Sequence, residues 1–134
     1  MDLDPSQPMF GDADQRPIVF TGAAADATRR AAIEAVAEVV EVDDGAGGVD
    51  LGAMVGWLGD QGAAVVLTEG GPSLLGQLVE RGLVDELCLT VAPLLVAGTA
   101  ERIAHTPADA PATELALERV LEADGSLLLR YVRR

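Results

Sequence analysis

The sequence contains one cysteine, one histidine and no lysine. The single cysteine, Cys88, excludes a disulfide within the chain. With one histidine, His105, the usual zinc ligand sets are absent, so we expect no metal site. Cys88 lies in the apolar run 87–91 and is predicted to fill the core, because free cysteine is among the most buried residue types. His105 lies in a loop rich in alanine and proline and is predicted to be on the surface.

Basic residues and long apolar runs are also scarce. The chain contains nine basic and 22 acidic residues. The resulting formal net charge of −13 argues against electrostatic binding of nucleic acid or of anionic membranes. The sequence has neither an N-terminal hydrophobic segment nor a run of about eighteen apolar residues, so we expect no signal peptide and no membrane span. The composition therefore favours a cytoplasmic protein that acts on a small molecule.

Only four aromatic residues occur in the 134, yet 49% of the residues are hydrophobic, so alanine, valine and leucine must fill the core. The length suits one domain, which we assign to residues 1–134. Residues 1–15 hold two prolines and four aspartates and are predicted to form an N-terminal arm or loop.

One stretch, residues 64–82, organises the chain. Residues 64–67 form a short apolar run typical of a strand covered on both faces. Gly70 and Gly71 follow, then Pro72 at the first position of a predicted helix that ends at Gly82. Backbone N–H groups at such a helix start favour a phosphate, although the glycines could equally serve only to make a tight turn. The spacing matches neither the dinucleotide fingerprint nor the P-loop.

The remaining segments predict an α/β order with parallel neighbouring strands. We expect strands at 18–21, 39–42 and 87–91 and helices at 23–37 and 49–59. Near the end, Asp124 and Gly125 separate two apolar runs, which is a strong hairpin signal. Residues 114–122 could be helical by propensity, but the alternation of apolar residues favours an antiparallel hairpin over 114–123 and 127–132.

Three segments carry a resemblance to a known family. Residues 69–75 (EGGPSLL), 82–87 (GLVDEL) and 91–98 (VAPLLVAG) resemble the C-terminal reductase domain of the riboflavin-biosynthesis RibD family, which has the dihydrofolate reductase fold. The resemblance implies a three-layer dihydrofolate reductase-like mixed sheet with helices on both faces and a C-terminal antiparallel hairpin. It covers the C-terminal half to two thirds of such a domain, so we expect its N-terminal strands to be missing and the domain to be partial.

The resemblance also implies a reaction and the residues that serve it. The reaction is hydride transfer from NADPH to the imine carbon of an aminopyrimidine ribosyl phosphate, as in 5-amino-6-(5-phosphoribosylamino)uracil reductase. Glu69 would face the ribosyl substrate as the catalytic residue; the alternative is an acid stabilised by the helix dipole. The residues implied for the cofactor are Gly70, Gly71, Pro72 and Ser73 at the pyrophosphate and Thr21 and Gly22 near the adenosine 2′-phosphate.

A second function class stays open beside the reductase. Without the N-terminal part of the domain, the chain could be a non-catalytic nucleotide- or phosphate-binding module, so the enzyme assignment is left undecided. The resemblance further implies a homodimer. Its interface would use the apolar residues Leu94, Leu95, Val96, Leu127, Leu129 and Tyr131, for which the alternative is burial in the core of a monomer.

Overall fold

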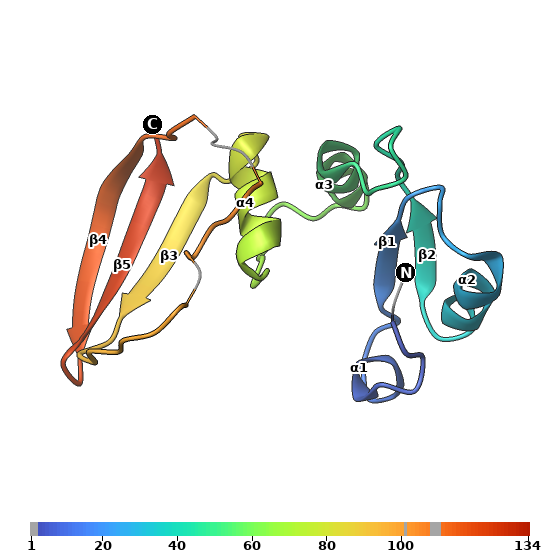
Figure 1. Cartoon of the computed structure of the whole chain (residues 1–134), viewed down its shortest axis with the longest axis horizontal. Helices are drawn as coiled ribbons and strands as arrows, with labels where there is room; N and C mark the ends of the chain where they lie inside the picture. Colours follow the sequence, from blue (N-terminus) through green and yellow to red (C-terminus); the bar gives the residue numbers. More distant parts are fainter. Residues whose placement is uncertain (1–2, 101, 108–110) are drawn as a thin grey trace. The chain divides into compact units, whose positions relative to one another are not determined.

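The computed structural model describes residues 3–100, 102–107 and 111–134 (Figure 1). The chain divides between Val66 and Leu67 into two compact units. The first unit contains one parallel sheet, and the second contains one antiparallel sheet. This mixed α/β composition is the one that the sequence predicts.

The first unit follows the order α1 (Pro8–Gly11), β1 (Ile18–Thr21), α2 (Ala27–Glu34), β2 (Glu38–Glu41) and α3 (Leu51–Asp60). Strands β1 and β2 are parallel, and α2 connects them as the crossover helix. Helix α2 begins later than predicted because the Asp26 carboxylate accepts a hydrogen bond from the Arg29 N–H and so caps the helix there. The core consists of Phe10, Val19, Ile33 and Ala37.

The second unit contains α4 (Pro72–Glu80), β3 (Glu86–Val91), β4 (Leu115–Ala123) and β5 (Ser126–Arg133). The strand order is β3–β5–β4, and all neighbours are antiparallel. Asp124 and Gly125 join β4 to β5 with φ of 51° and 74°, as a two-residue hairpin turn requires. The predicted hairpin is therefore confirmed, and the helical alternative for this segment is wrong.

Helix α4 packs against one face of this sheet. An apolar cavity of about 80 Å³ lies between them, lined by Leu75 and Val79 of α4, Leu87 of β3 and Leu115 of β4 together with neighbouring residues. Within α4, Gly76 and Leu78 are buried. The helix that carries the predicted phosphate-binding turn is thus held to the sheet by its apolar face.

Two expectations from the sequence are wrong. The predicted strand at 64–67 does not form among the described residues, and Val65 and Leu67 are 88% and 83% exposed. A strand requires a hydrogen-bonded neighbour, and in the described part of the chain none pairs with this run, where the two units divide. Cys88 is exposed, not buried. Successive strand residues face opposite sides, and Leu87 takes the side that faces α4.

Candidate functional site

The predicted phosphate-binding turn lies directly before α4. Gly70 and Gly71 have φ of 31° and 117°, which side chains of L-residues rarely adopt, and Pro72 is the first residue of the helix. The Leu75 N–H donates to the Gly71 carbonyl at 3.1 Å and closes the first helical turn. Gly70, Gly71, Pro72 and Ser73 are all exposed. In the structure these four predicted site residues therefore lie together at an accessible helix start.

The start of α4 can accept an anion. The N-cap residue Gly71 provides no side-chain cap at this end of the helix, where the first N–H groups and the positive end of the helix dipole lie. A Cβ atom built on Gly71 would have no atom within 4 Å. A phosphate group can therefore approach the backbone here without displacing a side chain, which fits the pyrophosphate of a dinucleotide.

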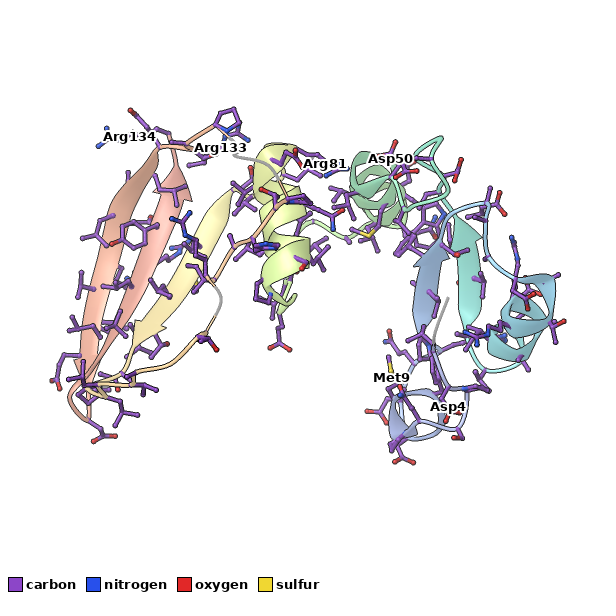
Figure 2. The ribbon with its side chains drawn as sticks, viewed as in Figure 1. Asp4, Met9, Asp50, Arg81, Arg133 and Arg134 are labelled. Atoms are coloured by element: carbon purple, nitrogen blue, oxygen red, sulfur yellow. The ribbon has the colours of Figure 1, made fainter. Side chains whose placement is uncertain are left out.

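The other end of α4 is firmly terminated. Gly82 has φ of 65°, and the Leu83 N–H donates to the Leu78 carbonyl at 2.9 Å while the Gly82 N–H donates to the Val79 carbonyl at 3.0 Å. These two bonds form a Schellman motif, as the glycine stop in the sequence predicts. Figure 2 shows Arg81 at this end of the helix, where its guanidinium donates to the Gln77 carbonyl at 3.2 Å. Backbone hydrogen bonds therefore fix both ends of α4, the bond from Leu75 to Gly71 at its start and the Schellman motif at its end.

A contact that the sequence does not predict lies at the first residue of α4. The His105 backbone N–H donates to the Pro72 carbonyl at 3.0 Å. The segment around His105 crosses the helix at Gly76, where an added Cβ would lie 2.1 Å from the His105 carbonyl oxygen. The His105 side chain is exposed, as predicted. A glycine inside a helix of good helix formers is the only signal in the sequence for such a crossing.

A groove runs along the exposed side of α4 beside this crossing. Its volume is about 340 Å³, and it is lined by Ser73, Gln77, Glu80, Arg81, His105 and Pro107. Glu69 lies directly before the turn and is exposed. Glu69 and the four turn residues therefore form one continuous accessible segment of the second unit.

Thr21 and Gly22 lie in the first unit, at the end of β1. Thr21 is buried, and its hydroxyl donates to the Gly22 carbonyl at 3.2 Å. A Cβ on Gly22 would lie 2.2 Å from the Gly48 carbonyl oxygen, so the loop after β2 covers this glycine. The Ala23 N–H donates to the Asp43 carboxylate at 3.0 Å. In this structure the end of β1 is covered by its own unit.

A polar cluster lies on the exposed face of the second sheet. It consists of Glu86, Cys88, Glu118 and Arg130. Arg130 forms ion pairs with Glu86 and, at 2.9 Å, with Glu118. The hydrogen bond from Arg130 lowers the pKa of Glu86. The Cys88 thiol donates to the Glu86 carboxylate at 3.4 Å, and this bond raises the pKa of the thiol. An exposed thiol whose protonated form is favoured is a poor nucleophile, so this cluster offers no reactive cysteine.

Within the described ranges, no group of three or more His, Cys, Asp or Glu side chains is placed to hold a metal ion. The helices of the described residues are too short or too polar to cross a membrane.

Comparisons with known proteins place these features in context. Residues 1–129 match the family model of the RibD C-terminal domain. The riboflavin biosynthesis protein RibD of Escherichia coli (strain K12) is 39% identical over an alignment of 70 residues, and the match covers 48% of this chain and 19% of that protein. The chain thus spans about a fifth of this curated relative.

Solved structures show the same fold. A pyrimidine reductase-like protein from Corynebacterium diphtheriae aligns with a TM-score of 0.81 and 23% identity, covering 98% of this chain and 57% of that one. One form of Acinetobacter baumannii RibD aligns with a TM-score of 0.73 and 18% identity, covering 99% of this chain and 35% of that one. These likenesses confirm the predicted dihydrofolate reductase-like fold class.

Proposed function

The chain belongs to the RibD C-terminal domain family, and we propose that it acts, alone or as part of a longer protein, as an NADPH-dependent reductase of riboflavin biosynthesis. The substrate would be 5-amino-6-(5-phosphoribosylamino)uracil, and the site of action the cytoplasm. The observation that carries this proposal is the exposed start of α4, which follows two glycines in positive φ and whose N-cap Gly71 provides no side-chain cap. This is a backbone site for a dinucleotide pyrophosphate.

The turn would hold the cofactor through its backbone. Gly70 and Gly71 keep side chains away from the pyrophosphate, and Pro72 sets the direction of the first helical turn. The Ser73 N–H and hydroxyl would both donate to phosphate oxygens. Bound NADPH supplies the hydride that reduces the substrate carbon. The protein's contribution at this end is to bind and orient the cofactor.

Thr21 and Gly22 would serve the adenosine end of the cofactor. The Ala23 N–H beside them donates to the Asp43 carboxylate. A 2′-phosphate would have to replace this carboxylate as the acceptor, because two anions cannot share one donor at low cost. Asp43→Asn should therefore tighten NADPH binding and leave NADH binding unchanged, which titration of both nucleotides measures. If Asp43→Asn changed the affinities for NADPH and NADH equally, the 2′-phosphate would not bind at this position.

Glu69 would face the ribosyl part of the substrate. Its position directly before the phosphate-binding turn supports this role, because the substrate must lie next to the cofactor for hydride transfer. Glu69→Gln should lower kcat and leave the Kd of NADPH unchanged. A loss of NADPH affinity instead would mean that Glu69 supports the turn and not the substrate.

Titration calorimetry with NADPH tests the proposed site. Gly71→Asp should abolish binding, because it places a side chain and a negative charge where the pyrophosphate approaches. Gly62→Asp is the matched control: Gly62 has φ of 90°, and a Cβ there also meets no atom within 4 Å. Equal NADPH affinity of the Gly71→Asp variant and the wild type would refute the site.

An assay of NADPH oxidation in the presence of the ribosylaminopyrimidine phosphate distinguishes the two function classes, a reductase and a non-catalytic binding module. Turnover that depends on Glu69 supports the reductase. NADPH binding without turnover in the full-length protein would favour a nucleotide-binding module.

We also propose a homodimer that uses the apolar segment after β3. Leu94, Leu95 and Val96 are 76%, 105% and 82% exposed, and Leu127 at the start of β5 is 41% exposed. Light scattering after size exclusion should give a dimer that Leu95→Glu dissociates without unfolding. Val65→Glu, at another exposed apolar residue, is the control. A monodisperse wild-type monomer at tens of micromolar would refute the dimer.

A further inference from the structure

We propose that Glu41 determines the nucleotide preference of this chain, because its ion pair with Arg30 withholds that cation from the 2′-phosphate of NADPH. The chain then takes its hydride from NADH as well as from NADPH. This inference rests on the proposed function and adds to it the choice between the two nucleotides. Glu41 acts through Arg30 and does not itself contact the cofactor.

Glu41 lies beside a residue predicted to serve the adenosine end of the cofactor. It is the last residue of β2, and in the parallel register it pairs with Thr21, the last residue of β1. Neighbouring strands of a sheet are about 4.8 Å apart, so the backbones of these two residues are adjacent. Ligands of open α/β sheets bind outside the carboxyl ends of parallel strands. Glu41 therefore lies at the end of the sheet where an adenosine ribose would bind.

Arg30 of α2 brings a positive charge to this end of the sheet. Its Nε donates to the Glu34 carboxylate at 2.9 Å, and its Nη1 donates to the Glu41 carboxylate. One cation thus pairs with two anions, and the three side chains together carry a net negative charge. In dinucleotide sites an arginine near the ribose accommodates the 2′-phosphate of NADP. In this chain a 2′-phosphate would have to compete with two carboxylates for the guanidinium.

The loop after β2 adds negative charge at the same place. The Asp43 carboxylate accepts the Ala23 N–H, one residue beyond Gly22, at 3.0 Å. The neighbouring Asp44 carboxylate accepts the Gly48 N–H at 2.8 Å, and the Gly48 carbonyl covers Gly22. A 2′-phosphate would bring up to about two further negative charges to these aspartates. The 2′-hydroxyl of NADH brings no charge and can donate a hydrogen bond to a carboxylate, so the loop favours NADH.

Two other arginines belong to the first unit. Arg16 donates to the Glu34 and Ala37 carbonyls at 2.6 and 3.0 Å. Ala37 directly precedes β2, so Arg16 binds at the opposite end of this strand from Glu41. Arg29 is exposed on α2, next to Arg30. Arg29 is therefore the cation that the experiment must distinguish from Arg30.

Titration calorimetry of the full chain with NADPH and NADH measures the preference. In the wild type, NADPH should bind less than about tenfold more tightly than NADH. Glu41→Gln keeps the shape of the side chain and removes its charge, which releases Arg30 for the phosphate. The Kd for NADPH should then fall about fivefold, the effect of one exposed ion pair, while the Kd for NADH stays at its wild-type value. Adenosine 2′,5′-bisphosphate and 5′-AMP should show the same difference, which assigns it to the adenosine end.

Arginine variants identify the cation. Arg30→Gln alone should leave the ratio of the two Kd values unchanged, since Glu41 already pairs with the guanidinium. In the Glu41→Gln background, Arg30→Gln should cancel the gain in NADPH affinity, whereas Arg29→Gln should preserve it. Glu38→Gln is the matched control, because Glu38 is the exposed first residue of β2, about 10 Å along the strand from Glu41. Circular dichroism and urea midpoints verify that each variant is folded.

The outcomes distinguish this inference from the proposed function. Wild-type binding of NADPH about tenfold or more tighter than that of NADH overturns the inference and leaves the reductase standing. An unchanged ratio of the two Kd values in Glu41→Gln also overturns it. If Glu41→Gln shifts the ratio but neither nucleotide is oxidised in the presence of the ribosylaminopyrimidine phosphate, the reductase fails and the role of Glu41 stands. Binding of neither nucleotide overturns both.

Discussion

The conformation of Gly71 permits a test that involves no ligand. Gly71 has φ of 117°, and a Cβ built there would meet no atom within 4 Å. Gly71→Ala therefore adds neither a clash nor a charge, and its whole effect is the cost of holding an L-residue in this conformation. That cost is of order 1–3 kcal/mol. We expect the free energy of unfolding of the variant to fall by about this amount.

Urea unfolding followed by circular dichroism measures this cost, with Gly56→Ala as the reference. Gly56 lies inside α3, and an added Cβ there meets no atom within 4 Å. Alanine should stabilise that helix by about 0.5–1 kcal/mol. The two substitutions are chemically identical and should change stability in opposite directions. If Gly71→Ala is as stable as Gly56→Ala, the turn does not need a positive φ, and the backbone site described above is wrong.

Three further predictions concern the rest of the chain. Glu86→Gln should speed alkylation of Cys88 by iodoacetamide at pH 8, because the Glu86 carboxylate raises the pKa of the thiol; an unchanged rate would mean that the contact does not form in solution. The pairing with Arg130 lowers the pKa of Glu86, so its stabilising effect is complete above the pKa of the unfolded carboxyl and is lost as the pH falls through the lowered value. The stability difference between Glu86→Gln and the wild type, measured by urea unfolding, should therefore disappear in acid. Asp50→Ala should cost about 0.5–2 kcal/mol, because the Asp50 carboxylate accepts the Gly52 and Ala53 N–H groups at the start of α3, and no loss in urea unfolding would contradict this cap.

Local patterns in the sequence predicted the elements that depend on nearby residues. The hairpin follows from Asp124 and Gly125, which both tolerate positive φ. The start and end of α4 follow from Pro72 and Gly82, whose effects act within one turn of the helix.

Features that depend on distant neighbours could not be predicted in this way. The apolar run 64–67 has the composition of a strand, but a strand also needs a partner that local pattern does not reveal. Residue type alone predicts that Cys88 lies in the core, whereas the alternation along β3 puts it on the exposed face of the sheet with Glu86. The contact between His105 and Pro72 joins residues far apart in the chain, and only the glycine at position 76 hints at it.

Mapping the binding of NADPH on the amide spectrum of the ¹⁵N-labelled chain tests the central claim most directly. If the start of α4 binds the pyrophosphate, the largest shifts should fall on Gly71, Ser73 and Leu74. The same titration with NADPH should leave the amides of β4 and β5 near their original positions. Shifts elsewhere with none in residues 70–74 would contradict the claim.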